Sequence, residues 1–356
     1  HWTHTFAGGS LVDVQASSDT NQRTVSSGIK DRLRTYDLAA QYTVAAGRRH
    51  ALVIGGGYRL SDDKFMRAPG TSFLDPESST LNLGNLFVQD EITLDERLRL
   101  TLGLKLEHNS FTGLEYLPDA RLAWQVSPET LWWAAVSRAV RTPSRFDRDI
   151  RNPGLVAGGP DFNSEYLTAF ELGYRGQPTV RLTLSASAFY HVYDDLRTTE
   201  SPAGALFPLV IRNGMEGRTY GVELWGTYAV ADWWQVSGGL TTLRKELRLK
   251  DGVRDIFGVA AAGADPDYQA VLRSRMNITD RLGLDVSLRA VDDLPSPAIP
   301  AYVEADARLA WLMNEHVELS LLGFNLLNDQ HGEFRNPSIP LREFNRGLQA
   351  QARLRF

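Results

Sequence analysis

The sequence predicts an all-β fold, a transmembrane antiparallel β-barrel with about 16 strands. Three observations predict this class: apolar and polar residues alternate strictly in several segments, these segments are about ten residues long, and tight turns alternate with long polar connections. A helical membrane protein is excluded, because no stretch approaches the roughly 18 consecutive apolar residues that a spanning helix needs. Even the apolar segment 319–327 contains Ser320, Gly323 and Asn325.

Strict alternation is the first of these observations. Between residues 97 and 107 every even-numbered position is leucine, while the odd-numbered positions include Arg97, Lys105 and Glu107. The same pattern recurs in the segments 180–188, 281–289 and 343–356. Strands of soluble sheets average about 5 to 6 residues, whereas a tilted strand that crosses a bilayer needs about 9 to 11. Strand length therefore favours a membrane barrel over a soluble sandwich.

The strands are expected in regular order along the chain. They should begin near residues 1, 33, 50, 81, 97, 118, 130, 165, 179, 217, 233, 267, 281, 301, 315 and 342. Tight turns are expected at Ala46-Gly47, Leu94-Asp95, Ser127-Pro128, Gln177-Pro178, Ala231-Asp232, Thr279-Asp280 and Asn314-Glu315. Long polar loops are expected near 17–32, 63–79, 110–117, 141–164, 196–216, 247–266, 294–300 and 329–341. This asymmetry is typical of outer-membrane barrels, with turns in the periplasm and loops outside the cell.

Lipid imposes further expectations on such strands. It offers no hydrogen-bond partner, so every spanning strand must be paired and the sheet must close. Glu171, Arg175 and Glu223 are expected to face the lumen, where salt bridges are commoner than ligand contacts. Aromatic residues near strand ends fit interfacial girdles or lumen packing, namely Trp124, Trp132, Trp133, Tyr174, Tyr228, Trp233, Trp234 and Trp311.

The composition limits the classes of function. The 356 residues carry a formal net charge of −5, which is too small to imply nucleic-acid binding, and no run of five basic residues occurs, so no nucleic-acid partner is expected. The absence of cysteine removes disulfides and thiolate metal sites, and no metal, nucleotide or nucleophile signature is found. Arginine greatly outnumbers lysine, which reflects genomic base composition, a lumen with paired carboxylates, or a phosphate-rich lipid surface.

The C-terminal region resembles that of a known family. Residues 317–334 read Val-Glu-Leu-Ser-Leu-Leu-Gly-Phe-Asn-Leu-Leu-Asn-Asp-Gln-His-Gly-Glu-Phe, followed by a loop and an alternating strand that ends on Phe356. This resembles the C-terminus of TonB-dependent receptors, in which an Asn-Leu-Leu/Phe-Asp/Asn step, here residues 325–328, ends the penultimate strand. The resemblance implies that the barrel-assembly machinery reads Phe356 as a membrane-insertion signal.

Further motifs match the family in the same order along nearly the whole chain. They are Phe87-Val-Gln-Asp-Glu91, Ser137-Arg-Ala-Val-Arg-Thr-Pro143, Asn152-Pro-Gly-Leu155, Phe170-Glu-Leu-Gly-Tyr-Arg175, Phe189-Tyr-His-Val-Tyr-Asp-Asp-Leu196, Tyr220-Gly-Val-Glu223 and Pro300-Ala-Tyr302. Each motif is weak alone, but their order at strand-to-loop positions is specific. The resemblance implies one barrel domain over residues 1–356.

The start of the chain departs from the family pattern. The resemblance implies a signal peptide, an energy-coupling box and a globular plug, followed by a barrel of about 22 strands. The first three are not found in this sequence, which begins His-Trp-Thr-His-Thr-Phe. We therefore expect a partial chain that lacks the plug and roughly the first six strands of a 22-stranded barrel, or else a smaller barrel closed on itself.

The resemblance implies a receptor and transporter of the bacterial outer membrane, not an enzyme. Its expected function is TonB-energised uptake of a scarce nutrient, with a ferric siderophore or similar chelate as ligand. The implied partners are outer-membrane lipid and lipopolysaccharide, the TonB energy-coupling complex acting through the missing plug, the barrel-assembly machinery and a small-molecule ligand. No cofactor and no metal site are expected.

Ligand contacts are expected in the loops and the upper lumen. Cationic and aromatic side chains there suit an anionic chelate by charge complementarity. The candidates are Arg145, Arg148, Arg151, Phe162, Arg212, Tyr268 and Arg335. Proline at position 143 lacks the donor that a strand ladder requires, so Arg141-Thr142-Pro143 is expected to start the loop rather than to grip ligand.

Other functions fit the sequence less well. A haem receptor would need a histidine between Arg141 and Leu155, where none occurs, although His331 in a later loop leaves haem open. A passive 16-stranded porin closed on itself is the main alternative, with the loop 141–164, rich in arginine and aspartate, as its constriction.

One group of residues in the sequence resembles a catalytic cluster. His191, Asp194 and Asp195 lie together near the outer end of one strand, and such residues can activate water or a serine. They fall within the family's ordinary strand end, and no matching serine or second acidic pair accompanies them.

Overall fold

One large curved sheet dominates the computed structural model, which describes residues 1–25, 28–66, 72–263, 265–334 and 342–355. Its long strands, with the short β1, are β1 (Trp2–Thr5), β2 (Leu11–Thr24), β3 (Lys30–Ala46), β4 (His50–Met66), β6 (Ser78–Thr93), β7 (Leu98–Asn109), β8 (Gly113–Ser127), β9 (Thr130–Arg141), β12 (Glu165–Thr179), β13 (Leu182–Glu200), β14 (Leu209–Ala231), β15 (Trp234–Leu249), β16 (Tyr268–Thr279), β17 (Leu282–Val291), β20 (Tyr302–Asn314), β21 (Val317–Phe324) and β24 (Gly347–Leu354).

Short elements gather at one end of this sheet. The strands β5 (Phe73–Leu74), β10 (Ile150–Asn152) and β11 (Val156–Ala157) join it, while β18 (Leu294–Pro295) with β19 (Ala298–Ile299) and β22 (Gln330–Phe334) with β23 (Arg342–Asn345) form separate two-stranded sheets. The helical elements of the described ranges are α1 (Arg145–Asp149) and η1 (Val259–Ala262). None of these helices is long and apolar enough to cross a membrane.

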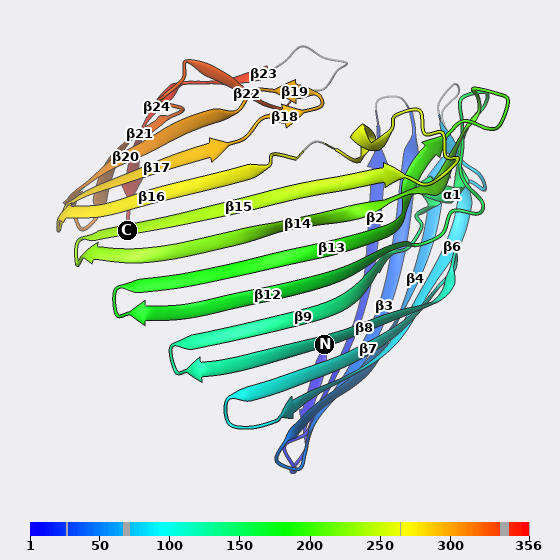
Figure 1. The fold of residues 1–356 in the computed structure, drawn as a ribbon, viewed down its shortest axis with the longest axis horizontal. Helices are drawn as coiled ribbons and strands as arrows, with labels where there is room; N and C mark the ends of the chain where they lie inside the picture. Colours follow the sequence, from blue (N-terminus) through cyan, green and yellow to red (C-terminus); the bar gives the residue numbers. More distant parts are fainter. Residues whose placement is uncertain (26–27, 67–71, 264, 335–341, 356) are drawn as a thin grey trace.

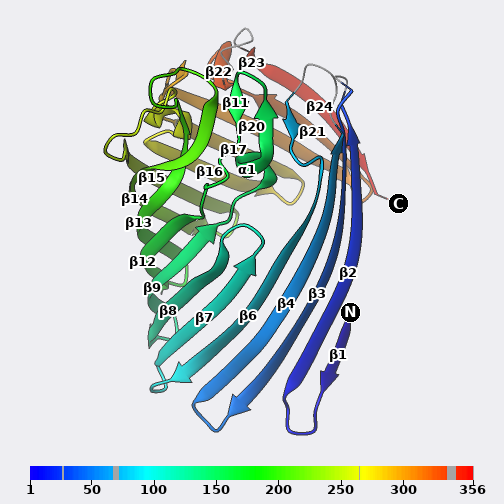
Figure 2. The same ribbon diagram turned by 90° about the vertical axis from the view of Figure 1, so that its right-hand side faces the viewer.

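The long strands follow chain order and run antiparallel to their neighbours. Figure 1 shows β7 to β17 side by side across the front, with β2, β3 and β4 behind them. In Figure 2 the same sheet bends round so that these two walls face each other. Within the described ranges, β1 pairs with β2 alone and β24 with β21 alone. The predicted antiparallel all-β fold class is confirmed.

The apolar face of the sheet lies on its outer surface. Leu102 and Leu104 of β7 are 44% and 40% exposed, and Leu86 of β6, opposite Leu106, is 68% exposed. On the other face of β7, the Nζ atom of Lys105 donates a hydrogen bond to Oε2 of Glu107 at 2.6 Å. Leucines that lie open in this way are suited to hydrocarbon, whereas the charged face is suited to a wet lumen.

Most tight turns lie where the alternation predicts them. Turns follow β3, β6, β8, β14, β16 and β20 at the predicted dipeptides. The turn after β12 is centred on residues 180–181, slightly beyond the predicted Gln177-Pro178. The connection expected as a long loop at 110–117 is instead a short turn, because β7 ends at Asn109 and β8 begins at Gly113.

The N-terminal region differs most from the prediction. The polar loop expected near 17–32 is largely strand, since β2 pairs with β3 over its whole length. Residues 15–24 read Gln-Ala-Ser-Ser-Asp-Thr-Asn-Gln-Arg-Thr, which are polar on nearly every position and carry no alternation. Backbone pairing with β3, and not an apolar face, makes this segment a strand, so the hydrophobic pattern could not reveal it.

The backbone conformation of Asn325 ends the penultimate long strand, β21. The strand β21 ends at Phe324, and Asn325 follows with φ +53°, in the left-handed region that asparagine tolerates better than most residues. Its backbone N–H donates to Oδ1 of Asp306 at 3.0 Å, and its Nδ2 donates to the carbonyl of Asn345 at 3.2 Å. The predicted strand end at this motif is confirmed.

The aromatic residues near strand ends divide between the two faces. Trp132 is 42% exposed on the outer face and its ring centroid lies 4.9 Å from that of Tyr174, as expected for a girdle. The adjacent Trp133 points to the lumen, where its ring lies against Gly173 and occupies the space that a Cβ would fill there. Both interpretations of these aromatics, girdle and lumen packing, therefore apply.

Candidate functional site

The connection between β9 and β12, residues 142–164, folds over the extracellular end of the sheet, and α1 marks its position in Figures 1 and 2. Ser144 caps α1 in a reciprocal arrangement: its hydroxyl accepts from the backbone N–H of Asp147, and the carboxylate of Asp147 accepts from the backbone N–H of Ser144 at 2.9 Å. Because β9 ends at Arg141, the prediction that Arg141-Thr142-Pro143 starts this loop is confirmed.

Two strand pairings hold the loop 142–164 in place. β10 pairs antiparallel with β5, in the connection between β4 and β6, so that Ile150 is opposite Leu74. β11 pairs in parallel with the outer end of β14, where Val156 is opposite Leu209. The loop is thus attached both to the β4–β6 connection and to β14, and it lies across the mouth of the sheet between them.

Arg145 is a buried clamp within this loop. Its side chain is 5% exposed, its Nη1 lies 2.6 Å from Oδ2 of Asp63 on β4, and its Nε lies 2.8 Å from Oδ2 of Asp149. Its Nη2 donates to the backbone carbonyl of Pro76. All three guanidinium nitrogens are therefore engaged inside the protein, in a geometry that fixes the loop to β4 and the 75–77 segment.

Asp147 forms a second buried contact point. Its side chain is 2% exposed and lies 3.0 Å from Nη1 of Arg141 and 3.4 Å from Nε of Arg197. Burial alone would raise its pKa, but hydrogen bonds from Ser144 and Arg141 outweigh burial and hold the pKa of Asp147 below its ordinary value of 3.8. The carboxylate is therefore charged and joins the loop to the ends of β9 and β13.

A small apolar cluster completes the packing of the loop. Ile150, Phe162 and Ile211 are 6%, 1% and 2% exposed and contact one another, with Leu74 and Val156 packed against them. Arg148 borders this cluster: its Nε donates to the carbonyl of Phe162 at 2.9 Å and its Nη1 to the carbonyl of Phe111 at 2.9 Å. The loop is therefore a packed unit with its own core.

A cavity of about 740 Å³ lies beside this unit. The end of the loop forms one side, the outer end of β14 forms another, and the connection after β15 forms a third. Its lining includes Arg151, residues 157–163, Glu200, residues 210–214, Lys250, Asp251 and Val253. This size is within the range of small-molecule sites.

The charges around the mouth cavity are mixed. Arg212 is 56% exposed, and its Nε lies 3.9 Å from Oε2 of Glu200. In the described ranges the terminal nitrogens of Arg212 have no hydrogen bond, so they are free to donate to a ligand. Arg151 donates from Nη1 to the carbonyls of Ile150 and Arg148 at 2.8 and 3.3 Å.

Lys250 contributes a third cation to the cavity wall. Its Nζ lies 2.6 Å from Oδ1 of Asp194 and 2.5 Å from Oδ1 of Asp195. Burial alone would lower its pKa, but these two carboxylates outweigh burial and raise the pKa of Lys250 above its ordinary value. Asp194 and Asp195 therefore hold this lysine, while the His191 ring centroid lies 5.0 Å from that of Phe189.

The structure separates the predicted ligand residues into groups. Arg151, Phe162 and Arg212 line the mouth cavity, although Phe162 is almost wholly inside the loop core, and Arg145 and Arg148 are engaged with the protein. Tyr268 lies away from the cavity, on the outer face of β16 with Leu272. Arg335 and Phe356 lie outside the described residues. Asn213 and Lys250 also line the cavity and were not predicted, since no sequence motif marks them.

A second cavity, of about 480 Å³, lies on the lumen wall formed by β13 to β17. It is lined mainly by polar and aromatic side chains of the inner face, including Ser185, Ser187, Glu223, Trp225, Thr241, Gln269, Arg273 and Arg289. The Oγ atom of Ser187 donates to Oε2 of Glu223 at 3.4 Å. Glu171, Arg175 and Glu223 share this face, opposite Leu172 and Leu224, so their predicted lumen orientation is confirmed.

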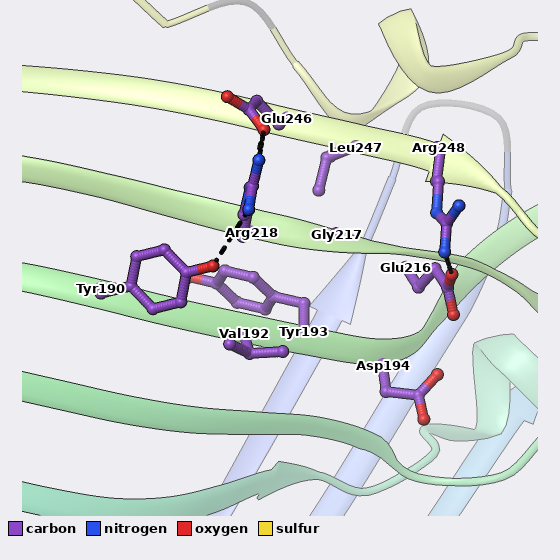
Figure 3. Close-up of a pocket in the computed structure, with 10 residues that line it drawn as sticks. All are labelled: Tyr190, Val192, Tyr193, Asp194, Glu216, Gly217, Arg218, Glu246, Leu247 and Arg248. Carbon is purple, nitrogen blue, oxygen red and sulfur yellow. Dashed lines mark hydrogen bonds and ion pairs between the residues drawn. The ribbon is translucent and has the colours of Figure 1, made fainter.

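A third cavity, of about 570 Å³, lies on the outer face at the extracellular end of β13, β14 and β15 (Figure 3). Arg218 Nε lies 2.7 Å from Oε2 of Glu246 and Arg218 Nη1 lies 3.2 Å from the hydroxyl of Tyr190. Arg248 Nη2 lies 2.5 Å from Oε1 of Glu216. Both guanidinium groups are therefore neutralised by carboxylates on the same face.

Comparison with known proteins agrees with this architecture. Residues 1–326 match the family model described as TonB dependent receptor-like, beta-barrel. An iron-regulated outer membrane virulence protein of Vibrio cholerae serotype O1 is 25% identical over 175 residues, which cover 45% of this chain and 27% of that protein.

Solved structures share the fold. The siderophore receptor PirA from Pseudomonas aeruginosa gives a TM-score of 0.73 at 16% identity, covering 99% of this chain and 62% of that chain. The FrpB iron transporter from Neisseria meningitidis gives a TM-score of 0.77 at 13% identity, covering 99% of this chain and 62% of that chain. A mutant of the ferric enterobactin receptor of Pseudomonas aeruginosa, in complex with enterobactin, gives a TM-score of 0.73 at 16% identity, covering 98% of this chain and 61% of that chain.

The chain thus spans less than two thirds of the length of these solved receptors and about a quarter of the Vibrio protein. At such identities the solved structures establish the fold, whereas the family model covers most of the sequence. The protein therefore belongs to the TonB-dependent receptor-like β-barrel family of the bacterial outer membrane.

Proposed function

We propose that this barrel belongs to a receptor that imports a scarce nutrient with energy from the TonB complex, and that its ligand is a ferric siderophore or a similar anionic chelate. The observation that carries the proposal is the cavity at the extracellular mouth, where Arg151 belongs to a loop that is fixed at both sides and Arg212 lies near the outer end of β14. Cations held on a rigid frame attract and orient an anionic ligand at low energetic cost.

In this proposal the predicted ligand residues have two different roles. Arg145, Arg148 and Phe162 hold the loop, because their polar atoms or rings are engaged within the protein. Arg151 and Arg212 contact the ligand, and Lys250 lines the same cavity. Tyr268 and Arg335 remain predicted contacts, with Tyr268 placed on the outer face of β16.

The proposed partners follow from the family. The TonB complex acts through a plug domain inside the barrel, and release of ligand toward the periplasm depends on that contact. Phe356 directs the chain to the barrel-assembly machinery, and outer-membrane lipid with lipopolysaccharide surrounds the finished barrel. We propose no catalytic step and no resident cofactor, so the ligand leaves chemically unchanged.

The family match favours this receptor over the passive porin that the sequence left as an alternative. The names of the structural neighbours, which include siderophore and ferric enterobactin receptors, support an iron chelate as ligand.

Uptake of radiolabelled iron tests the proposal directly. The receptor that contains this barrel is produced in cells that lack their own siderophore receptors, and ferric siderophores are supplied one at a time. We expect accumulation that stops when the tonB gene is deleted. Accumulation that is equal with and without TonB would instead identify a passive pore.

A further inference from the structure

A cluster of basic side chains lies on the outer face of the sheet at the extracellular end of β3 and β4. These two strands pair over their whole length without a register shift, so their even-numbered residues share one face. Leu38 and Tyr58 on that face are 55% and 52% exposed, which identifies it as the lipid-facing side. Further toward the strand ends, the same face carries Lys30, Arg32, Arg34, Asp62 and Lys64.

The arrangement of these charges is unfavourable without an outside partner. Arg32 of β3 is directly opposite Lys64 of β4, and residues opposed in this way have Cβ atoms about 5 Å apart. Like charges at such positions repel. Asp62, opposite Arg34, is the one carboxylate among the five, and in the described ranges none of the five has an ion pair or a side-chain hydrogen bond.

Arginines elsewhere on the sheet form ion pairs that the cluster lacks within the described residues. On the lumen face of the same two strands, Arg59 Nε lies 2.7 Å from Oδ1 of Asp37. On the outer face of β14 and β15, Arg218 and Arg248 are each paired with a glutamate (Figure 3). Lys30, Arg32, Arg34 and Lys64 therefore differ from Arg218 and Arg248, which lie on the same outer face.

The position of the cluster relative to the membrane suggests its partner. Tyr36 and Tyr58, 47% and 52% exposed, lie on the same face just below it. Tyrosine concentrates at the level where hydrocarbon meets the polar headgroups. The four cations lie nearer the extracellular ends of the two strands than these tyrosines, at the level of the headgroups.

We propose that the cluster Lys30, Arg32, Arg34 and Lys64 binds the phosphate groups of a phosphorylated glycolipid in the outer leaflet, lipopolysaccharide. Guanidinium groups bind phosphate oxygens through paired, charge-assisted hydrogen bonds, and a phosphate between Arg32 and Lys64 converts their repulsion into two attractions. This inference rests on the outer-membrane location and not on ligand uptake, so its failure would leave the uptake proposal untouched.

Binding of purified lipopolysaccharide to the detergent-solubilised receptor tests the proposal. The double variant Arg32→Gln/Lys64→Gln is compared with the wild type, with folding checked by heat-modifiable migration in electrophoresis. Loss of two cations near a lipid surface corresponds to an affinity about thirtyfold weaker. In detergent without lipopolysaccharide, the same variant should be at least as stable to heat as the wild type, because the like-charge contact is gone.

The matched control is Arg218→Gln/Arg248→Gln, which removes the same charge from the same face at the same end of the barrel. It should bind lipopolysaccharide as the wild type does. Wild-type receptor should bind enzymatically dephosphorylated lipopolysaccharide as weakly as the Arg32→Gln/Lys64→Gln variant binds the intact form. The proposal is wrong if that variant keeps full affinity, if the control loses as much, or if inorganic phosphate alone stabilises the wild type equally, which would indicate a free-anion site.

Discussion

Nη1 of Arg145 lies 2.6 Å from Oδ2 of Asp63, a residue 82 positions earlier in the chain, and this contact joins the loop 142–164 to β4. Replacing Arg145 by alanine leaves Asp63 and Asp149 without their counter-charge inside the protein, which costs about 3 to 5 kcal/mol. We expect the loop to become sensitive to limited proteolysis in Arg145→Ala. The exposed Arg212→Ala serves as the control and should resist proteolysis like the wild type.

Arg151 and Arg212 should contribute to affinity for an anionic chelate. Each cation lost from the mouth cavity should weaken binding about tenfold, as expected for a charge-assisted contact of about 1.4 kcal/mol. Quenching of tryptophan fluorescence by a ferric siderophore measures this in Arg151→Gln and Arg212→Gln. Asp161→Asn, which removes a negative charge from the same cavity, should strengthen binding. Unchanged affinity in all three variants would move the ligand site elsewhere.

Asp147 makes the loop sensitive to acid. A carboxyl whose pKa is lower in the folded protein stabilises the fold above its ordinary pKa, here 3.8, and this contribution disappears as pH falls through the lower folded value. Hydrogen exchange of residues 142–164 should therefore be slow from neutral pH down to about 4 and faster at lower pH. Asp147→Asn should exchange faster already at neutral pH and show a weaker acid response. A wild-type loop whose protection does not change as pH falls below 3.8, or an Asp147→Asn loop with the same acid response as the wild type, contradicts this account.

Gly221 on β14 lies at a close approach of two strands. A Cβ there would meet the backbone carbonyl oxygen of Thr242 and lie 2.8 Å from Cζ of Phe189. A backbone oxygen cannot move aside cheaply, so Gly221→Ala should cost about 1 to 3 kcal/mol. Gly238→Ala on β15 is the control, because its nearest atoms would lie at 3.5 Å. The temperature at which the heat-modifiable form disappears should fall for the first variant alone.

Leu104 tests which face of β7 meets lipid. An arginine on the lipid face near the middle of the bilayer costs about 2 to 4 kcal/mol, whereas the lumen face tolerates charge. Leu104→Arg should therefore reduce the fraction of protein that folds into phospholipid vesicles. Thr101→Arg on the same strand faces the lumen opposite Glu91 and should fold like the wild type. Equal folding of both variants would contradict the assignment of faces.

The sequence predicts the strand segments that cross the lipid better than it predicts the segments that extend beyond it. Where hydrocarbon lies on one side of a strand and water on the other, as along residues 97–107, apolar and polar residues alternate in the sequence. Beyond the lipid both faces of a strand meet water, so the outer half of β2 has no such pattern. Its strand conformation depends on pairing with β3, which a local pattern cannot show.

The candidate site was only partly predictable for a related reason. Arg145 and Arg151 look alike in the sequence, and only the approach of Asp63, far away in the chain, makes the first a clamp. Lys250 joins the cavity through Asp194 and Asp195, which are again distant in sequence. Tyr268 is different: Ala270 and Leu272 follow it at alternate positions, a pattern from which its outward face could have been predicted.

The length of β14 sets where the mouth cavity lies. At about 3.3 Å per residue, its 23 residues extend roughly 75 Å. Inclined by about 40°, the strand rises roughly 55 Å, against an apolar band of about 25 Å. Arg212 is near the outer end of β14, so its guanidinium lies well beyond the lipid on the extracellular side. A molecule that diffuses toward the cell therefore meets this part of the barrel before it reaches the membrane.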